Sequence, residues 1–301
     1  MPILFALVGA TGIGKSCLSL ELAEKYDADI IGVDSRQIYE GFAIGTAQPG
    51  LDDLKRVPHH LVNFLNPEES YSAGRFVADV KEILQESPNH NFILVGGTGL
   101  YLQSLMLGLP EIPPVDVAVR SDLEDMAERN GLDSLYEMAC RVDPEAMANV
   151  DKNNMQRMVR ILEVYRTSGK KLSEWQKDRR GGIGKIPVFS LCRSRENLYA
   201  RINARVDQMM KDGWMDEVRL LAKTVPSSAP AWQSLGYREL LAASTAVEVE
   251  RVLDDVKKKS RNYAKRQLTW FRWQVESEPI DLDTETDCLT VVERKLTKKI
   301  F

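Results

Sequence analysis

A glycine-rich stretch near the start of the chain has the residue types and the spacing of a phosphate-binding loop. Residues 9–16 read Gly-Ala-Thr-Gly-Ile-Gly-Lys-Ser and fit the pattern G-x-x-x-x-G-K-[ST]. In this pattern the glycines let backbone N–H groups converge on phosphate oxygens at the start of a helix, the lysine adds a positive charge, and the serine hydroxyl binds Mg²⁺. We therefore expect a phosphate compound, with Mg²⁺ on the serine, at Gly9, Ala10, Thr11, Gly12, Ile13, Gly14, Lys15 and Ser16.

A carboxylate follows the next stretch of the chain that has the character of a buried strand. Residues 3–8 and 29–34 are mostly apolar runs, and a helical repeat that ends near Tyr26 lies between them. In open α/β sheets, ligands bind beyond the carboxyl ends of the strands, so Asp34 is predicted to lie beside the phosphate-binding loop. The alternative is that Asp34 only caps a turn or a helix.

A hydroxyl group follows a third predicted strand, residues 92–95. That strand leads into Gly-Gly-Thr-Gly at residues 96–99, where the glycines permit a close approach of the backbone and Thr98 offers its hydroxyl. No Asp or Glu ends this strand, although ATP-hydrolysing proteins with such a loop usually carry a second acid there. The sequence therefore argues against a simple nucleoside triphosphatase.

The elements that would hold these groups indicate an α/β protein, with a parallel sheet flanked by helices and a helical insertion. The apolar stripe of residues 72–86, with Ser72 as its cap, predicts a helix that covers the sheet, and residues 188–192 predict a further strand. A proline-rich break at residues 109–114 marks the start of the insertion. We expect a catalytic core at 1–115 and 187–301 and an all-helical subdomain at 116–186.

The composition excludes several classes of protein. The chain has 301 residues, of which 44% are hydrophobic, and its formal charge of −4 argues against a protein that coats nucleic acid over its whole surface. Four widely spaced cysteines and the pair His59 and His60 lack metal-ligand spacing, so neither a disulfide framework nor a zinc site is expected. The first apolar run breaks at Gly9, too early for a signal peptide or a membrane span. A reduced, cytoplasmic setting fits best.

Positive charge is nevertheless concentrated in two places. Residues 116–150 contain nine acids and three bases, whereas residues 151–185 contain four acids and ten bases. Residues 257–273 contain seven bases, no acid and four aromatic residues. Such stretches suit a nucleic-acid surface, but they equally suit solvated helix faces, and both interpretations remain open at this point.

Together these groups suggest a reaction in which the phosphate group leaves. A diphosphate held by backbone amides, Lys15 and Mg²⁺ is a good leaving group because its developing charge is already neutralised. Asp34 could accept a proton from the incoming nucleophile. If that nucleophile is the amine of a nucleic-acid base, the base must leave its stack, which is easiest in a single-stranded loop such as an RNA hairpin.

Eight segments, in order along nearly the whole chain, resemble the tRNA dimethylallyltransferase family. They are residues 9–16, 34–39, 45–49, 58–61, 71–76, 95–101, 235–240 and 263–272. The resemblance implies a P-loop NTPase-like fold whose helical insertion contacts the tRNA anticodon stem. It also implies transfer of a dimethylallyl group from dimethylallyl diphosphate to N6 of adenine 37 in tRNA, with release of diphosphate.

The resemblance further implies roles for individual residues. Asp34 would be the base that accepts the N6 proton, Thr98 would lie near the diphosphate and the tRNA, and Arg219 would contact the diphosphate during catalysis. Contacts to tRNA are implied for Asp34, Ser35, Arg36, Gln37, Thr98, Arg120, Gln156, Arg157, Met158, Val159 and Arg160. Residues 151–154 depart from the His-Pro-Asn-Asp run common in the family, which weakens the expectation there.

The chain resembles the short bacterial form of this family, and we expect it to be a monomer. Eukaryotic relatives end in a zinc finger, whereas this chain has only Cys288 after Phe271. An adenylate isopentenyltransferase, which prenylates a free nucleotide, shares the loop and the acid but needs no insertion that grips tRNA. The sequence also leaves room for a small-molecule P-loop kinase and for a non-catalytic RNA-binding module.

Overall fold

The computed structural model describes residues 2–285 and 287–300, and the chain forms two compact units. The first unit comprises residues 1–103 and 185–301, and the second comprises residues 104–184. The second unit therefore begins earlier than the predicted boundary at 116. The reason is that the backbone at residues 105 and 106 is hydrogen-bonded to the end of the same unit. Ile183 N–H donates to Leu105 O at 2.9 Å, and Gly184 N–H donates to Met106 O at 3.1 Å.

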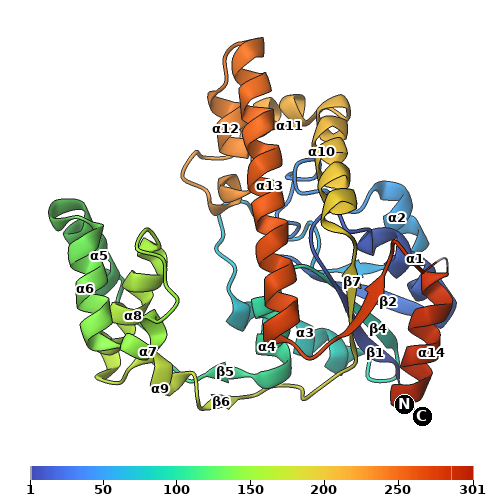
Figure 1. Cartoon of the computed structure of the whole chain (residues 1–301), viewed down its shortest axis with the longest axis horizontal. Helices are drawn as coiled ribbons and strands as arrows, with labels where there is room; N and C mark the ends of the chain where they lie inside the picture. Colours follow the sequence, from blue (N-terminus) through green and yellow to red (C-terminus); the bar gives the residue numbers. More distant parts are fainter. Residues whose placement is uncertain (1, 286, 301) are drawn as a thin grey trace. The chain divides into compact units, whose positions relative to one another are not determined.

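The first unit is built on one six-stranded sheet with the order β3-β2-β4-β1-β7-β8 (Figure 1). Every neighbouring pair in the sheet is parallel, so the predicted fold class is confirmed. The strands predicted at 3–8, 29–34, 92–95 and 188–192 are present, whereas β3 and β8 were not predicted. The strands are β1 Leu4–Val8, β2 Ala28–Val33, β3 His59–His60, β4 Asn91–Gly96, β7 Val188–Cys192 and β8 Glu278–Asp281.

The register of the three central strands places their loops at one edge of the sheet. Gly96 at the end of β4 pairs with Val8 at the end of β1 and with Val33 at the end of β2. The phosphate-binding loop, Asp34 and residues 97–99 therefore leave the sheet at the same level. This confirms the prediction that these groups follow neighbouring strand ends.

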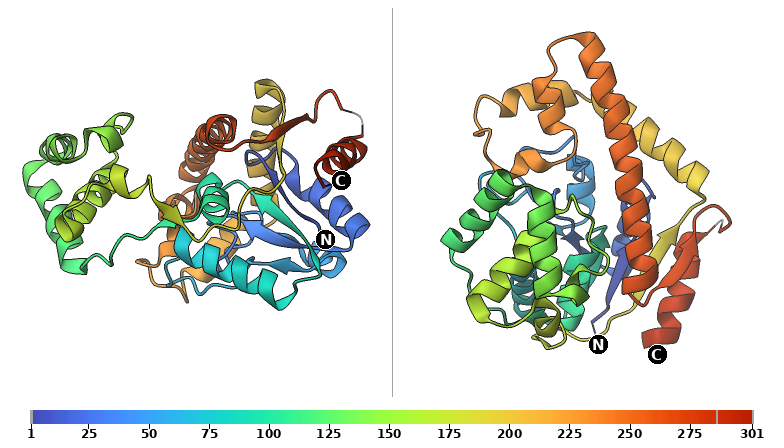
Figure 2. Two further views of the ribbon diagram at one scale, coloured as in Figure 1. Left: turned by 90° about the horizontal axis from the view of Figure 1, so that it is seen from below. Right: turned by 60° about the vertical axis from the view of Figure 1, so that its left-hand side comes forward.

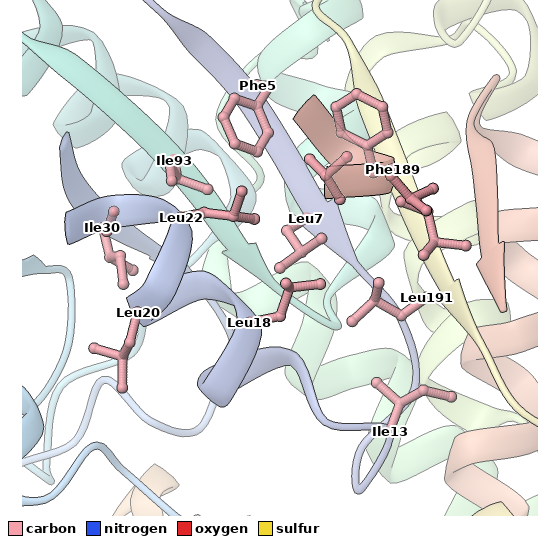
Figure 3. Packing of buried hydrophobic residues seen from close by; sticks show 14 of the residues in the cluster. Phe5, Leu7, Ile13, Leu18, Leu20, Leu22, Ile30, Ile93, Phe189 and Leu191 are labelled. Atoms are coloured by element: carbon pink, nitrogen blue, oxygen red, sulfur yellow. The ribbon is translucent and has the colours of Figure 1, made fainter. Parts of the chain in front are cut away.

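A hydrophobic core fixes the first helix, α1, against the sheet (Figure 3). Leu18 and Leu22 on α1 pack in the same cluster as Phe5 and Leu7 on β1, and Leu22 is fully buried. Burial of each such side chain contributes about 1.5–3 kcal/mol relative to exposure. Because α1 cannot move without opening this cluster, the loop that begins it is held in place.

Long helices complete the first unit. Ser72 caps α3 as predicted, because its Oγ accepts a hydrogen bond from Arg75 N–H at 3.1 Å. The longest helix, α13, has 29 residues, starts with a capping box of Thr245 and Glu248, and runs beside α10 (Figures 1 and 2). The α-helices are α1 Lys15–Tyr26, α2 Leu51–Arg56, α3 Ala73–Glu86, α4 Gly99–Leu107, α10 Arg195–Lys211, α11 Trp214–Leu221, α12 Tyr237–Ala242, α13 Ala246–Gln274 and α14 Cys288–Ile300. A 3₁₀ turn covers Pro230–Gln233.

The second unit is mainly helical, but it also contains a short antiparallel ribbon of β5 and β6, so the prediction of an all-helical insertion was wrong in this detail. Gly108 permits the ribbon, because a Cβ there would lie 2.1 Å from the carbonyl oxygen of Arg180. The elements of this unit are β5 Leu109–Pro110, α5 Val117–Asn130, α6 Leu132–Val142, α7 Pro144–Met147, α8 Met155–Ser168, α9 Leu172–Trp175 and β6 Arg179–Arg180.

Two further observations concern membrane-spanning helices and disulfide bonds. Among residues 2–285 and 287–300, no helix combines the length and the apolar character needed to cross a membrane. The cysteines Cys17, Cys140, Cys192 and Cys288 are all free thiols.

Candidate active site

The phosphate-binding loop leads into α1 without a side chain to cap that helix. Gly14 occupies the N-cap position with φ 115°, a conformation that favours glycine, and no side chain accepts a hydrogen bond there. No acid lies in the first turn. The N–H groups of the first turn and the positive end of the helix are therefore compatible with an anionic ligand.

Lys15 and Ser16 follow at the start of α1. Lys15 Nζ donates hydrogen bonds to the carbonyl oxygens of Gly9 at 3.0 Å and Ala10 at 2.9 Å. Ser16 is exposed, so its hydroxyl is accessible to a ligand. The loop thus has its charged side chain folded over it and an accessible hydroxyl at its end.

Asp34 combines the two roles that the sequence left open. Its Oδ1 accepts hydrogen bonds from Arg36 N–H at 2.8 Å and Gln37 N–H at 3.3 Å, so it does cap the turn after β2. In the described part of the chain, no hydrogen-bond donor is found for the second oxygen, Oδ2. The carboxylate also acts electrostatically on Lys15 and Arg205. One oxygen therefore shapes the turn, and the other is available to a substrate.

Burial has a clear effect on the two cations. The pKa of Lys15 is lowered to about 8, mainly by burial; Asp34 opposes this change and Arg205 adds to it. Burial also lowers the pKa of Arg205 from its usual value, again opposed by Asp34. Two cations thus share one carboxylate in a partly desolvated site, and this excess of positive charge favours a polyanionic ligand.

The lowered pKa of Lys15 predicts that diphosphate binding depends on pH. Above about pH 8 the ligand-free protein loses the Lys15 proton, so the dissociation constant for inorganic diphosphate should rise toward about tenfold per pH unit. Calorimetry near pH 8 should show uptake of on the order of half a proton on binding. Lys15→Met should lose this dependence, whereas Lys55→Met, on exposed α2, should retain it; equal pH profiles for wild type and Lys15→Met would contradict the prediction.

Thr98 lies beside the same strand end. Its N–H donates to Val33 O at 3.1 Å, and its Oγ1 accepts a hydrogen bond from Ser35 N–H at 3.1 Å. Tyr263 on α13 interacts with both Thr98 and Asp34, and burial raises the pKa of its phenol to about 12, so the phenol stays protonated at neutral pH. The predicted neighbours Asp34, Ser35 and Thr98 are thus brought together.

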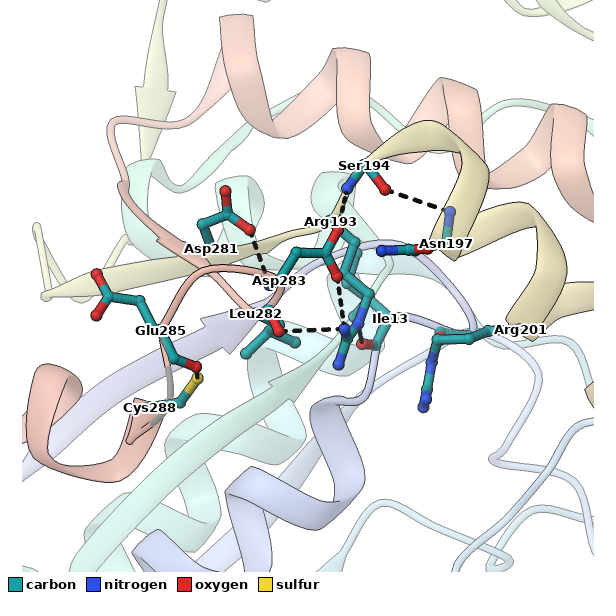
Figure 4. Close-up of polar contacts among 11 residues, drawn as sticks. Ile13, Arg193, Ser194, Asn197, Arg201, Asp281, Leu282, Asp283, Glu285 and Cys288 are labelled. Carbon is teal, nitrogen blue, oxygen red and sulfur yellow. Dashed lines mark hydrogen bonds and ion pairs between the residues drawn. The ribbon is translucent and has the colours of Figure 1, made fainter.

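Three arginines that the sequence reasoning missed surround the phosphate-binding loop. Arg205 Nη1 donates to Thr11 Oγ1 at 3.2 Å, and Arg201 Nε donates to Gly12 O at 3.0 Å. Arg193 Nε donates to Ile13 O at 2.9 Å (Figure 4). Arg201 and Arg205 are four residues apart on α10, so they share one face of that helix. This spacing is the signal in the sequence that could have indicated them.

Arg219 lies on the exposed side of α11, and the diphosphate contact that the resemblance implies for it stays a prediction. Its side chain on α11 is 70% exposed and lies 3.6 Å from Asp216. The buried side of α11 carries Trp214, Val218 and Leu221, so the helix turns Arg219 toward solvent. Of the three arginines that contact the phosphate-binding loop, Arg205 is the one that interacts electrostatically with Asp34.

In the second unit, two arginines expected to contact tRNA converge on one buried acid. Arg120 on α5 donates to Glu163 on α8 at 2.8 and 2.9 Å, and Arg160 donates to it at 2.7 Å. Glu163 is fully buried, whereas Arg120 and Arg160 are 46% and 38% exposed. Glu163 thus orients two guanidinium groups that remain accessible.

The neighbouring residues of α8 divide between surface and core. Gln156 is exposed and Arg157 is half-buried, and burial lowers the pKa of Arg157 from its usual value. Met158 and Val159 are 0% and 2% exposed in the core of this unit. Their side chains hold α8 against its neighbours, so the expectation that these two contact tRNA is corrected.

Glu163→Gln should destabilise the second unit. Burial alone would raise the pKa of Glu163, but hydrogen bonds from Arg120 and Arg160 outweigh it and lower the pKa. The loss of these charged hydrogen bonds should cost about 2–3 kcal/mol at pH 7. Because the folded pKa is lowered, this contribution is present above the pKa of an unfolded glutamate and is lost as the pH falls through the folded value.

Urea unfolding of both proteins at pH 7 and at pH 4 measures the effect of Glu163→Gln. The difference in the free energy of unfolding should shrink at the lower pH. Glu137→Gln, which changes an exposed acid on α6, should behave as wild type. An equal difference at both pH values would show that the charge of Glu163 is not responsible.

The comparison with known proteins agrees with this geometry. The sequence profile described as IPP transferase matches residues 37–274. The chain belongs to the IPP transferase family. It is 37% identical over 297 residues to the tRNA dimethylallyltransferase of Fusobacterium nucleatum, covering 98% of this chain and 95% of the relative. It is 38% identical over 288 residues to the protein of the same name from Bacillus subtilis, covering 92% of each.

Solved structures of IPP transferases have the same fold. The full-length tRNA isopentenylpyrophosphate transferase from Bacillus halodurans matches with a TM-score of 0.70 and 32% identity, covering 99% of this chain and 98% of that chain. A eukaryotic dimethylallyltransferase acting on tRNA matches with a TM-score of 0.79 and 26% identity, covering 99% of this chain and 80% of that chain. The P-loop NTPase-like fold expected from the sequence is confirmed.

In this IPP transferase, the helix that carries Arg219 also contacts the loop of residues 43–45 through Glu217. Glu217 Oε2 accepts hydrogen bonds from Ala43 N–H at 3.1 Å and Ile44 N–H at 2.8 Å. Tyr237 donates its hydroxyl hydrogen to Glu217 Oε1 at 2.6 Å and accepts one from Gly45 N–H at 3.0 Å. Helix α11 therefore anchors the loop that follows Asp34.

The same loop is tied internally to Gln37. Gln37 Nε2 donates to Thr46 O at 3.1 Å and Ala47 O at 2.5 Å, and Gln48 Nε2 donates to Gln37 O at 3.0 Å. Ser35, Arg36 and Gln37, the predicted tRNA contacts, are all half-buried in this loop. The loop is thus a braced structure that presents these residues next to Asp34.

Proposed function

We propose that this IPP transferase transfers a dimethylallyl group from dimethylallyl diphosphate to N6 of adenine 37 in tRNA and releases diphosphate. The observation that carries the proposal is the shared environment of Asp34, Lys15 and Arg205 at the end of a phosphate-binding loop. A carboxylate beside two partly buried cations suits a reaction that removes a proton and expels an anion. The names of the relatives support the same substrates.

In the proposed reaction, Asp34, Lys15 and Arg205 account for the proton that is removed and for the charge that develops on the leaving group. A bond forms between C1 of the dimethylallyl group and N6 of adenine, while the bond between C1 and the diphosphate oxygen breaks and its electron pair leaves with the diphosphate. The proton of N6 moves to Oδ2 of Asp34. Lys15 and Arg205 offset the charge that develops on the leaving oxygen, which should lower the barrier by several kcal/mol. The adenine must first leave its stack, at a cost of a few kcal/mol.

The residues present also fit the Mg²⁺ that the loop pattern implies. Mg²⁺ keeps several water ligands and takes only one or two protein oxygens when a phosphate is present, and the exposed Ser16 hydroxyl provides one. Within the described ranges, no group of three His, Cys, Asp or Glu side chains could hold a metal by itself, which agrees with a site that the substrate completes. Mg²⁺ would neutralise charge on the diphosphate.

Basic surfaces support RNA as the acceptor. Lys258, Lys265 and Arg272 are exposed and seven residues apart on α13, which places them on one face, and Trp273 at their end is 74% exposed. Phosphate contacts and base stacking are the typical uses of such residues. Lys170, in the second unit, instead lies 4.3 Å from the ring centre of Trp175. We propose that the protein acts as a monomer in the cytoplasm.

The α13 face predicts a salt-dependent affinity. Replacing Lys258, Lys265 and Arg272 together by glutamine should weaken binding of an anticodon stem-loop and reduce the slope of log K against log salt by about 2–3. Filter binding between low and moderate salt measures the slope. Lys259→Gln is the matched control, because Lys259 is already paired with Asp255 and Glu239. An unchanged slope in the triple variant would make this face a solvated surface.

A comparison of acceptors tests the proposed function. The protein is incubated with dimethylallyl diphosphate, Mg²⁺ and either an anticodon stem-loop or AMP, and the products are weighed. The proposal requires a prenylated stem-loop and unmodified AMP. Prenylated AMP would indicate an adenylate isopentenyltransferase, ATP turnover without prenyl transfer would indicate a kinase, and RNA binding without any reaction would indicate a binding module.

A further inference from the structure

One buried glutamine on α13 joins two loops that arise from different strands. Gln267 is only 5% exposed. Its Oε1 accepts a hydrogen bond from Thr11 N–H in the phosphate-binding loop at 2.9 Å. Its Nε2 donates a hydrogen bond to Gly97 O, in the loop after β4, at 2.9 Å. These two partners fix the orientation of the amide, because a backbone N–H can only donate and a carbonyl oxygen can only accept.

The loop after β4 is shaped to receive this side chain. A Cβ at Gly97 would lie 2.2 Å from Nε2 of Gln267, and a Cβ at Gly99 would lie 2.1 Å from the indole of Trp270. Tyr263, one turn before Gln267, interacts with Thr98 in the same loop. Residues 263, 267 and 270 share one face of α13, so that face covers the loop that carries Thr98.

Thr11, the other hydrogen-bond partner of Gln267, is itself held by two helices. Thr11 gives its N–H to Gln267 and its Oγ1 accepts from Arg205, so this residue is held from α13 and from α10. The two helices are themselves joined, since Arg261 Nη1 donates to Asn203 Oδ1 at 2.6 Å. The Thr11 N–H is therefore used within the protein and is not available to phosphate oxygens.

We propose that Gln267 is a positioning residue that holds the phosphate-binding loop and the loop of residues 96–99 in register, and so sets where a bound diphosphate lies relative to Thr98 and Asp34. This inference rests on the proposed function. The amide supplies the acceptor and the donor together, whereas an ionised glutamate cannot donate and a methionine side chain can make neither hydrogen bond well. A displacement of about 1 Å between reacting groups is enough to slow a reaction about 10²-fold.

Two variants test the role of Gln267. Gln267→Met should weaken binding of inorganic diphosphate with Mg²⁺ about tenfold and lower kcat for prenyl transfer on the order of 10²-fold. Gln267→Glu keeps the acceptor but loses the donor when it is ionised. Its diphosphate affinity should therefore approach that of wild type as the pH falls from 8 to 5.5, because the protonated acid can donate to Gly97 O. Gln85→Met, an exposed glutamine on α3, should match wild type.

A measurement that needs no substrate separates this inference from the proposed function. In amide hydrogen exchange, Thr11 should be protected in wild type and should exchange at least about tenfold faster in Gln267→Met. If wild type fails to bind diphosphate, the proposed function fails, yet the exchange result still decides whether Gln267 holds the loop. Unchanged exchange at Thr11, or diphosphate affinity and kcat within twofold of wild type in Gln267→Met, would overturn the positioning role.

Discussion

Asp34→Asn should slow prenyl transfer by about 10²-fold or more while leaving affinity for the anticodon stem-loop nearly unchanged. The structure makes asparagine the right replacement. Oδ1 of Asp34 accepts hydrogen bonds from Arg36 and Gln37 N–H, and an asparagine keeps that acceptor while losing the ability to take up a proton. Single-turnover kinetics with saturating RNA measure the effect on the chemical step alone.

The control for Asp34→Asn is Asp52→Asn, which changes a 95% exposed acid at the start of α2. It should react at the rate of wild type. Asp34→Ala should be at least as slow as Asp34→Asn and should also loosen the turn after β2. Wild-type rates in Asp34→Asn would mean that the carboxylate serves only as a cap, which was the alternative that the sequence left open.

Arg205→Gln should lower kcat/KM for dimethylallyl diphosphate by about 10²–10³-fold, because it removes one positive charge from the place where the leaving group becomes negative. Arg205 is also hydrogen-bonded to Thr11 in the phosphate-binding loop. The affinity for inorganic diphosphate should therefore fall as well. Steady-state kinetics and calorimetry measure the two effects separately.

Arg219→Gln is the matched variant for Arg205→Gln, because Arg219 is exposed and lies 3.6 Å from Asp216 on its own helix. Its kcat/KM should stay within about twofold of wild type, as for most surface substitutions. The opposite result, a large loss in Arg219→Gln with little change in Arg205→Gln, would restore the role that the family resemblance implied and would reject the assignment from the geometry.

The strands with a clear apolar pattern, and the site residues that directly follow them, could be predicted from the sequence. The apolar runs that became β1, β2, β4 and β7 are continuous because both faces of a parallel sheet are covered. Asp34 and Thr98 could be placed because they follow such runs, and the Ser72 cap has a local signal. The two-residue strand β3 and the strand β8, with Ile280 as its one buried residue, have too little pattern to be recognised.

Residues whose contacts join segments far apart in the sequence could not be identified from local sequence patterns. Gln267 is hydrogen-bonded to Thr11, 256 residues away in the sequence, and to Gly97, 170 residues away. A local sequence pattern cannot predict such long-range contacts. The exposure of Arg219 follows from its helix, whereas the diphosphate contact implied for it rests on a short motif match and stays a prediction. Its neighbours Val218 and Leu221 are apolar and buried, which directs Arg219 outward. Met158 and Val159 are likewise apolar, and they are 0% and 2% exposed.

The most direct test of the central claim is the identity of the modified nucleoside. Wild-type protein is incubated with Mg²⁺, labelled dimethylallyl diphosphate and an anticodon stem-loop that carries adenine at position 37, and the RNA is digested to nucleosides. We predict one N6-dimethylallyladenosine for each diphosphate released, and no product from a stem-loop with inosine at that position, since inosine lacks the amine. Diphosphate released without a prenylated nucleoside, or label transferred equally to the inosine RNA, would contradict the account.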